Sequence, residues 1–281
     1  MKTEQGGDEV SNRIAEKNRQ NWDDYSYSYL SFNHSDRILK PVLENPEKAF
    51  HTECMKLIKK HVGSIAGKRI LVPSSGDNLA VFAFAMMGAR VTSCDISKNQ
   101  LDGAKETAGK IGLADKITFI ESDTMHLTEI PDGKFDLVYT SNGVHVWLND
   151  LESMYKNIYR TLASGGLSIL YDVHPFQRPF DENMCVRAPY DCVGPFEDEW
   201  NITFHWRVSD ILNAVAASGF RILETGEWFA EKDYERPFFM GLEDLVNGKT
   251  ASKEEVDRKH DWRQNPQMAI PHWIGVVSVK G

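Results

Sequence analysis

The segment RILVPSSGDNLAVFAFAMMGARVTSCDIS, residues 69–97, decides the fold of this chain. An apolar run at 70–72 meets a turn of small and polar residues at 73–78, and an apolar segment of helical length follows. A second β-branched run then ends in Asp95, 19 positions beyond Gly76. This order of strand, loop, helix and strand places the loop and the acid side by side at the carboxyl edge of a parallel sheet, where nucleoside ligands bind.

The rest of the chain continues the alternation of strands and helices. Strands are expected at 70–72, 91–95, 117–121, 135–139, 167–171, 221–228 and 273–279. The first five alternate with helices and predict a parallel, doubly wound sheet, whereas the last two follow each other as an antiparallel hairpin at its edge. The expected fold class is therefore α/β, with a seven-stranded, mostly parallel, Rossmann-like sheet.

The domain expected from this pattern covers residues 45–281, with loop-rich insertions at about 174–205 and 231–264. Residues 1–44 are expected to form an N-terminal extension or lid, of which residues 1 to about 20 are frayed or helical only in part. Within it, residues 22–29 are rich in aromatic side chains without a clean helical or strand period, so they predict either a flap packed on the domain or a lid over a ligand site.

Three helix starts carry capping signals. Asn45 precedes a proline and predicts one helix that continues to Ile65. Ser97 to Gln100 has the pattern of a capping box, and Ser209 is expected to cap a later helix. Gly165 and Gly166 are expected to stop the helix before the fifth strand.

Composition narrows the classes of partner and compartment. The 281 residues carry a net charge of −9, which disfavours a phosphate backbone as partner. The four cysteines lack a C-x-x-C pattern or a dense framework, so reduced thiols are expected. The charged amino terminus lacks the apolar stretch of a signal peptide, and no apolar run reaches membrane-spanning length. A soluble, cytoplasmic protein without membrane or nucleic-acid partners is expected, and its oligomeric state is left open.

The glycine content of the central loop separates three possible ligands. A dinucleotide requires glycines at three positions of G-x-G-x-x-G, and only Gly76 is suitably placed here. A P-loop requires Gly-Lys-Ser/Thr, which is absent from the loop. A nucleoside without phosphates can bind beside a loop with fewer glycines, because the acid after the second strand can accept hydrogen bonds from both ribose hydroxyls. S-adenosylmethionine meets that description.

At this point the sequence resembles the class I S-adenosylmethionine-dependent methyltransferases over residues 45–281. The resemblance is carried by the order and spacing of several short segments, which are Ser74-Ser75-Gly76-Asp77-Asn78, Gly88 to Thr92 leading to Asp95-Ile96-Ser97, Glu121-Ser122-Asp123, Phe135 to Val138, and Leu162 to Gly166. The chain departs from the family loop, acid-x-Gly-x-Gly-x-Gly, because Val72 replaces the acid, Ser74 the first glycine and Asn78 the third. It is also similar to a subgroup of uncharacterised bacterial methyltransferases with glycine-poor loops.

The resemblance implies a set of cofactor-binding residues. Asp95 would bind the ribose diol, Ile96 would lie against the adenine, and Asp123 would accept from the adenine amino group; for Asp95 and Asp123, a capping or turn role is the alternative. The implied set is Ser74, Gly76, Asn78, Asp95, Ile96, Ser97, Asp123, Thr124, Ser141, Asn142 and Gly143, of which the last three would line the methionine end.

The expected reaction is methyl transfer from S-adenosylmethionine to a small-molecule acceptor. His145 and His174 follow the fourth and fifth strands and are the candidate general bases, with a structural role as the alternative for each. No cluster of residues has convincing zinc spacing, so no metal is expected. The alternatives are a non-catalytic S-adenosylmethionine-binding protein and a nicotinamide-dependent oxidoreductase, which the missing glycines oppose.

Aromatic segments at 22–32, 176–206 and 234–239 predict a closed, mostly aromatic acceptor pocket. The alternative is that these side chains only cover the faces of the sheet.

Overall fold

A seven-stranded sheet organises the computed structural model, which describes residues 2–181, 183–234, 237–241, 244–245 and 247–281. Its strands are β1 (Arg69–Pro73), β2 (Arg90–Asp95), β3 (Ile117–Glu121), β4 (Phe135–Ser141), β5 (Leu162–Val173), β8 (Phe220–Trp228) and β9 (Trp273–Lys280). The strand order is β3-β2-β1-β4-β5-β9-β8, in which β1 to β5 are parallel and β9 is antiparallel to both of its neighbours. The predicted sheet and C-terminal hairpin are confirmed.

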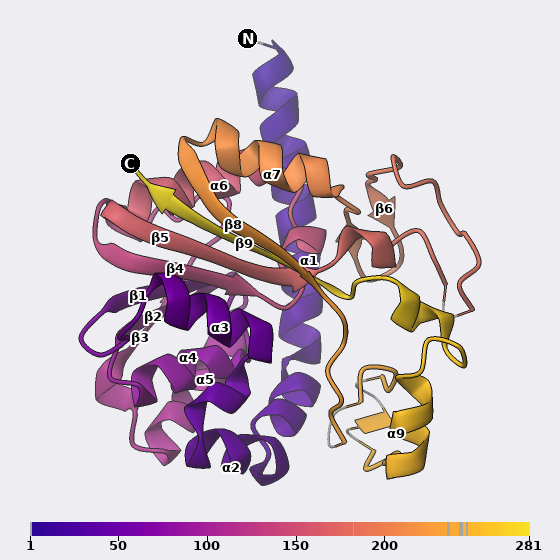
Figure 1. Ribbon diagram of the computed structural model, residues 1–281. Helices are drawn as coiled ribbons and strands as arrows, with labels where there is room; N and C mark the ends of the chain where they lie inside the picture. The colour runs from indigo at the N-terminus through magenta and orange to yellow at the C-terminus, as the bar shows by residue number, and fades with distance from the viewer. Residues whose placement is uncertain (1, 182, 235–236, 242–243, 246) are drawn as a thin grey trace.

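Helices cover both faces of the sheet (Figure 1). One face carries α3 (Thr52–His61), α4 (Leu79–Met86) and α5 (Lys98–Lys110), and the other carries α6 (Leu151–Thr161) and α7 (Val208–Ala217). Because β1 lies at the centre, its side chains alternate between the two hydrophobic cores: Ile70 and Val72 face the first core and Leu71 the second. The central strands therefore hold the carboxyl edge of the sheet rigidly.

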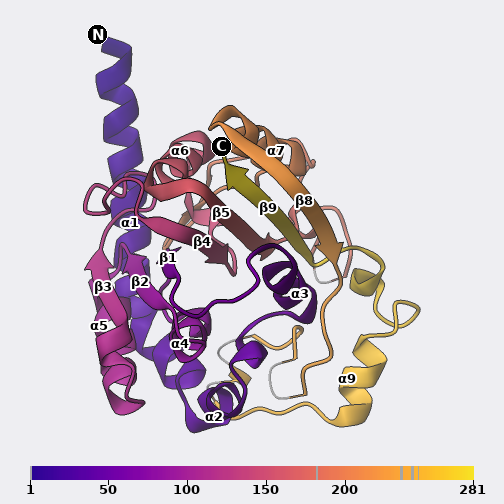
Figure 2. The same cartoon turned by 60° about the vertical axis from the view of Figure 1, so that its left-hand side comes forward.

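The amino-terminal extension is one long helix, α1 (Lys2–Asn33), followed by α2 (Asp36–Glu44). Its first turns project past the rest of the molecule, and its remainder runs alongside α5 (Figures 1 and 2). The expectation of partial helicity was wrong because the buried side of α1 includes the polar residues Asn18, Ser26 and Asn33 beside Ile14 and Phe32. Buried polar side chains obscure the apolar period from which a helix is predicted.

Other helix boundaries also differ from the sequence predictions. Asn45 caps a short 3₁₀ helix, η1 (Pro46–Ala49), and the chain then extends at Phe50 before His51 caps α3, so the single helix predicted to Ile65 is two elements. Helix α6 ends at Thr161, and the glycines expected to stop it lie inside β5, where the pairing with β4 shifts register. The cap of α7 is Arg207, whose backbone N–H donates to Asp210.

The two insertions have little regular structure in the described residues. The first contains the strand pair β6 (Phe196–Glu197) and β7 (Ile202–Thr203), and the second contains α9 (Lys253–Lys259). Short 3₁₀ turns are η2 (Ala114–Lys116), η3 (His145–Trp147), η4 (Pro175–Gln177) and η5 (Pro266–Ala269). Leu245 of the second insertion packs with Phe32 and Ile38, so this insertion contacts the amino-terminal helices.

Trp228 lies across two facing glycines in the C-terminal hairpin. Gly226 of β8 pairs with Gly275 of β9, and a Cβ atom on Gly275 would lie 2.2 Å from the Trp228 ring. The ring in turn stacks on His51 and Tyr171. The two glycines therefore make room for an aromatic group that joins the sheet edge to α3.

We expect Gly275→Ala to lower the free energy of unfolding by about 1–3 kcal/mol, because the added methyl group must displace Trp228. Gly109→Ala is the matched control: this position of α5 has no atom within 4 Å of an added Cβ, so the change should be neutral or stabilising by about 0.5–1 kcal/mol. Urea unfolding measures both, and equal effects of the two changes would contradict the account of Trp228.

Candidate functional site

A cavity opens at the carboxyl edge of β1, β2 and β4, and α1 lies over it. It is lined by Ala15, Asn18, Trp22, Ser74, Ser75, Gly76, Asp77, Asn78, Asp95, Ile96, Gln100, Asp123, Thr124, Met125, Ser141, Asn142, Gly143, Val144, Trp147 and Leu148. All of the predicted cofactor-binding residues except Ser97 are therefore brought together around one space. Ser97 is buried at the start of α5 instead.

The loop after β1 is held open by backbone conformation and by two side-chain contacts. Ser74 and Gly76 have φ values of 46° and 45°, which is the left-handed region that favours glycine. The Ser74 hydroxyl lies 2.7 Å from that of Thr124, and the Asn78 amide donates to the Ser141 hydroxyl over 2.8 Å. Asn78 also caps α4. These contacts tie the loop to the ends of the neighbouring strand segments.

Asp95 joins three segments at one end of the cavity. Its carboxylate accepts from the backbone N–H of Gly76 and of Ser97, each over 2.8 Å. Burial raises the pKa of this carboxyl to about 6, although the two backbone donors oppose that shift. Each carboxylate oxygen has a second acceptor site, so Asp95 can accept two further hydrogen bonds from a ligand in the cavity.

Gln100 is a site residue that the sequence prediction missed. Its side chain is 1% exposed, and neither its amide nitrogen nor its amide oxygen has a hydrogen-bond partner within the protein. A Cβ atom on Gly76 would lie 3.8 Å from the Gln100 oxygen and at the same distance from the Asp95 carboxylate. In a capping box the Gln100 side chain would accept from the backbone N–H of Ser97. That N–H donates to Asp95 instead, so the Gln100 amide is free to face the cavity.

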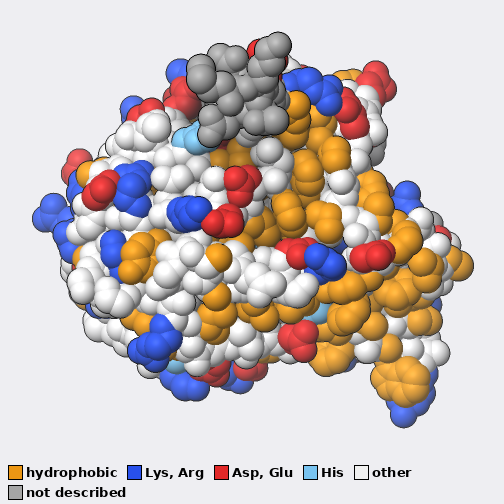
Figure 3. All heavy atoms as spheres, turned by 90° about the horizontal axis from the view of Figure 1, so that it is seen from above, with side chains coloured by type: hydrophobic (Ala, Val, Ile, Leu, Met, Phe, Trp, Pro, Cys, Tyr) orange, Lys and Arg blue, Asp and Glu red, His pale blue; other side chains and the backbone are white. Residues whose placement is uncertain are grey.

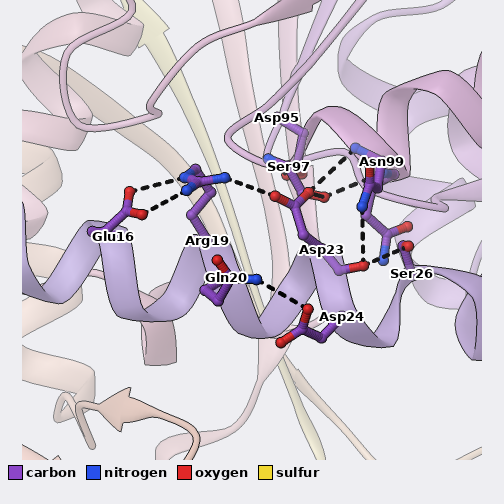
Figure 4. A network of polar contacts seen from close by, with 10 residues as sticks. Glu16, Arg19, Gln20, Asp23, Asp24, Ser26, Asp95, Ser97 and Asn99 are labelled. Atoms are coloured by element: carbon purple, nitrogen blue, oxygen red, sulfur yellow. Dashed lines mark hydrogen bonds and ion pairs between the residues drawn. The ribbon is translucent and has the colours of Figure 1, made fainter.

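Helix α1 closes the cavity and bonds to its rim. Asp23 accepts from the Ser97 hydroxyl over 2.7 Å, and Arg19 holds the same carboxylate from the preceding turn (Figure 4). Asn18 donates to the backbone oxygen of Trp147, whose ring lies 5.1 Å from that of Trp22. The aromatic part of the lining is this Trp pair; the segments at 176–206 and 234–239, which were expected to contribute, do not line the cavity where they are described.

The two candidate bases lie outside this cavity. His145 has its Nδ1 3.1 Å from the Asp172 carboxylate and its Nε2 2.9 Å from the Tyr155 hydroxyl. His174 caps η4 through Nδ1 and donates through Nε2 to Glu227, and burial lowers its pKa. Nε2 of each ring is thus hydrogen-bonded, and neither histidine is among the residues that line the space beside Ser141 to Gly143.

Among the described residues, no group of three or more His, Cys, Asp or Glu side chains could hold a metal ion. No helix in the described part of the chain is long and apolar enough to cross a membrane.

Comparison with known proteins identifies a domain of this chain. A family model described as a methyltransferase domain matches residues 71–170, which run from β1 into β5. Residues 71–170 therefore carry a methyltransferase domain, in a chain whose fold is that of S-adenosylmethionine-dependent methyltransferases. A sterol 24-C-methyltransferase of Gibberella zeae is 29% identical over 203 residues, which are 68% of this chain and 48% of that protein. The chain therefore spans about half the length of that curated relative.

Solved structures share the fold of this chain at low identity. An S-adenosylmethionine-dependent methyltransferase from Mesorhizobium loti has a TM-score of 0.57 and 20% identity, covering 80% of this chain and 96% of its own. The [4+2]-cyclase SpnF has a TM-score of 0.55 and 18% identity, covering 81% of this chain and 80% of its own. Because one of these two structures is named for a different reaction, the fold alone does not fix the chemistry.

Asp95 should make the stability of this protein depend on pH. Because the pKa of Asp95 is raised, the folded chain keeps a proton on this carboxyl between about pH 4 and pH 6, whereas the unfolded chain has released it. The contribution of Asp95 to the free energy of unfolding therefore falls as the pH rises through that window. We expect the unfolding free energy of Asp95→Asn to rise relative to wild type, by up to about 3 kcal/mol between pH 4 and pH 7. Urea unfolding at stepped pH tests this, and parallel curves for the two proteins would contradict it.

Proposed function

We propose that this protein transfers a methyl group from S-adenosylmethionine to a small-molecule acceptor, and that the cavity under α1 is its cofactor site. The observation that carries the proposal is the Gln100 amide, which is buried without a partner beside Asp95. Leaving a buried amide unpaired costs about 1–3 kcal/mol, so a ligand that supplies hydroxyl or amino groups accounts for its presence there.

The remaining lining residues fit the two ends of such a nucleoside. Asp95 and Gln100 lie where a ribose diol can donate and accept, with Ile96 and Met125 as apolar neighbours for the adenine. Asp123 accepts from the backbone N–H of Met125, which leaves acceptor sites for an adenine amino group. Ser141, Asn142 and Gly143 would then border the methionine moiety.

The bound cofactor would supply a methyl group already activated on a sulfonium, so the protein has mainly to position the acceptor and exclude water. Trp22, Trp147 and Leu148 form an apolar side of the cavity suited to excluding water. The titratable side chains among the lining residues are all aspartates, at positions 77, 95 and 123. We therefore propose that an acceptor that needs no histidine base is methylated, and that His145 and His174 hold the surrounding loops.

Several observations support a small acceptor over a nucleic acid. The lining residues include no Lys or Arg, although phosphate recognition requires such groups. On the face seen from above, basic side chains are scattered among acidic ones (Figure 3). The net charge of −9 also disfavours a nucleic acid as the acceptor. The sterol methyltransferase relative is named for a small-molecule acceptor.

We also propose that the protein is cytoplasmic. All four cysteines are free thiols, two buried and two exposed, as expected in a reducing compartment.

A second candidate function is nucleoside binding without methyl transfer. It is favoured by the departures at Val72, Ser74 and Asn78 and by the positions of the two histidines outside the cavity. The two functions share the binding site and differ only in turnover.

We expect S-adenosylhomocysteine to bind the purified protein and NAD not to bind, because the loop lacks the glycines that a pyrophosphate needs. Isothermal titration calorimetry with each ligand measures this. Binding of NAD without a response to S-adenosylhomocysteine would reject the proposal.

Gln100→Met should raise the stability of the protein and weaken its binding of S-adenosylhomocysteine. The apolar, nearly isosteric side chain removes the unpaired amide, so the free energy of unfolding should rise by about 1 kcal/mol while affinity for S-adenosylhomocysteine falls about tenfold. Gln20→Met is the control, since Gln20 bonds to Asp24 along α1 and does not line the cavity. Unchanged affinity in Gln100→Met would remove this residue from the cofactor site.

We further propose that α1 is a lid that opens for cofactor exchange. It supplies Asn18 and Trp22 to the cavity wall, and it is fastened by side-chain hydrogen bonds such as that between Asp23 and Ser97. Movable segments with few buried apolar contacts commonly gate enzyme sites.

The lid predicts a change in proteolysis near Tyr25 and Tyr27, which are 43% and 81% exposed. Chymotrypsin should cleave there more slowly when S-adenosylhomocysteine is bound. Asp23→Ala should cleave several-fold faster than wild type because it loses the bonds to α5, whereas Asp24→Ala should not, since the Asp24 side chain bonds to Gln20 of the same helix (Figure 4). Equal cleavage with and without ligand would remove α1 from the mechanism.

A further inference from the structure

A second, smaller cavity lies on the other side of η3 from the cavity under α1. Trp147 and Leu148, at the end of this turn, line the first cavity. His145 and Val146, at its start, line the second. The rest of the second cavity is formed mainly by the end of β5, by η4 and by residues 204–206, which follow β7. The two cavities therefore share η3 as a wall.

Arg178, directly after η4, brings a positive charge to the second cavity without a partner. Its side chain is half-buried, and burial lowers the pKa of the guanidinium, which still remains charged at neutral pH. None of its five N–H donors makes a hydrogen bond or an ion pair with the described residues. A partly dehydrated guanidinium without acceptors is unfavourable, so a ligand that accepts its hydrogen bonds accounts for this position.

Asp172 is the only carboxylate among the described residues that line the second cavity, and its hydrogen bonds go elsewhere. Its Oδ2 lies 3.1 Å from the backbone nitrogen of His145 and 3.1 Å from Nδ1 of the same residue. Its Oδ1 accepts from the backbone N–H of Val173. The charge of Asp172 favours the charged form of Arg178, but the described atoms of the two side chains form no ion pair. Asp172 therefore leaves the donors of Arg178 free.

His205 adds a second donor at this cavity, and Arg187 adds a second positive charge near it. The His205 ring stacks on Phe196 with 4.2 Å between the ring centroids, and its nitrogens have no hydrogen-bond partner among the described residues. Burial and the charges of Arg178 and Arg187 lower the pKa of this imidazole to about 4, so at neutral pH the ring is neutral and can donate one hydrogen bond. Positive charge and free donors thus gather at one space in a chain of net charge −9.

We propose that the second cavity is an oxyanion site, in which Arg178 and His205 bind the carboxylate or phosphate group of the methyl acceptor. That the group belongs to the acceptor rests on the proposed function. A guanidinium presents paired N–H donors whose spacing matches two oxygens of a carboxylate or a phosphate. The second cavity is smaller than the one under α1, so it can admit the acidic end of a molecule and not the whole of it. Since both cavities border η3, the rest of a molecule anchored there would lie beside the first.

Inorganic phosphate is the probe for the site itself. Phosphate should raise the melting temperature of wild type by about 2 °C or more over chloride at equal ionic strength, because it binds the folded state. Arg178→Gln should lose this shift, whereas Arg221→Gln should keep it. Arg221 is exposed at the start of β8 and has no ion pair with the described residues, so its replacement removes an equal charge away from the cavity and reports the non-specific effect of phosphate.

Two outcomes of this experiment would overturn the proposal. One is the absence of a shift in wild type, and the other is an equal shift in wild type, Arg178→Gln and Arg221→Gln. Arg178→Lys keeps the charge and loses the paired donors, so it should show a reduced shift. If Arg178→Gln is poorly folded, a full wild-type shift in Arg178→Lys overturns the proposal in its place.

A methylation assay distinguishes the acidic group of an acceptor from a free anion. A metabolite extract is divided by an anion exchanger, and both fractions are offered to the protein with S-adenosylmethionine labelled in its methyl group. The retained fraction should accept the label, about tenfold or more slowly in Arg178→Gln at limiting acceptor and at the wild-type rate in Arg221→Gln. Label in the unretained fraction alone would overturn the assignment to the acceptor and leave a site for a free anion. Failure of the proposed function would appear separately, as absent binding of S-adenosylhomocysteine with the phosphate result unchanged.

Discussion

The buried carboxylate of Asp95 is the contact on which the cavity under α1 depends. It stands where β2 ends and accepts from the backbone on both sides, from the loop after β1 and from the start of α5. Its second donor, Ser97, then bonds to Asp23, so a single chain of contacts runs from the sheet through α5 to α1. The carboxylate is difficult to ionise in this position, as its raised pKa indicates, and its two backbone donors offset part of that cost.

The cavity holds polar groups that the protein alone does not satisfy. Gln100 keeps a buried amide without a partner, and Ser74 and Asn142 adopt left-handed backbone conformations that are strained for residues other than glycine. Such features reduce stability, and these three residues all line the same cavity. They are typical of a surface shaped for a ligand.

The sheet could be predicted from the sequence because its central strands are apolar throughout and its turns carry glycine and capping residues. Asp95 could be placed at the end of β2 for the same reason. Helix α1 could not, since Asn18, Ser26 and Asn33 on its buried side make polar contacts where a periodic pattern requires apolar ones. Gln100 was hidden because its spacing from Ser97 also fits a capping box. The positions of His145 and His174 depend on the path of loops after the strands, and no local pattern encodes that path.

The hydrogen bonds that fasten α1 have a kinetic consequence. In the proposed lid role of α1, release of a nucleoside from under Trp22 would require breaking the bonds of Asp23 to Ser97 and of Asn18 to Trp147. The barrier to emptying the site would then be set by the contacts of the helix as well as by those of the ligand. The hinge of such a lid would lie near residue 34, where α1 turns into α2 and His34 bridges the loop after β1 and α5.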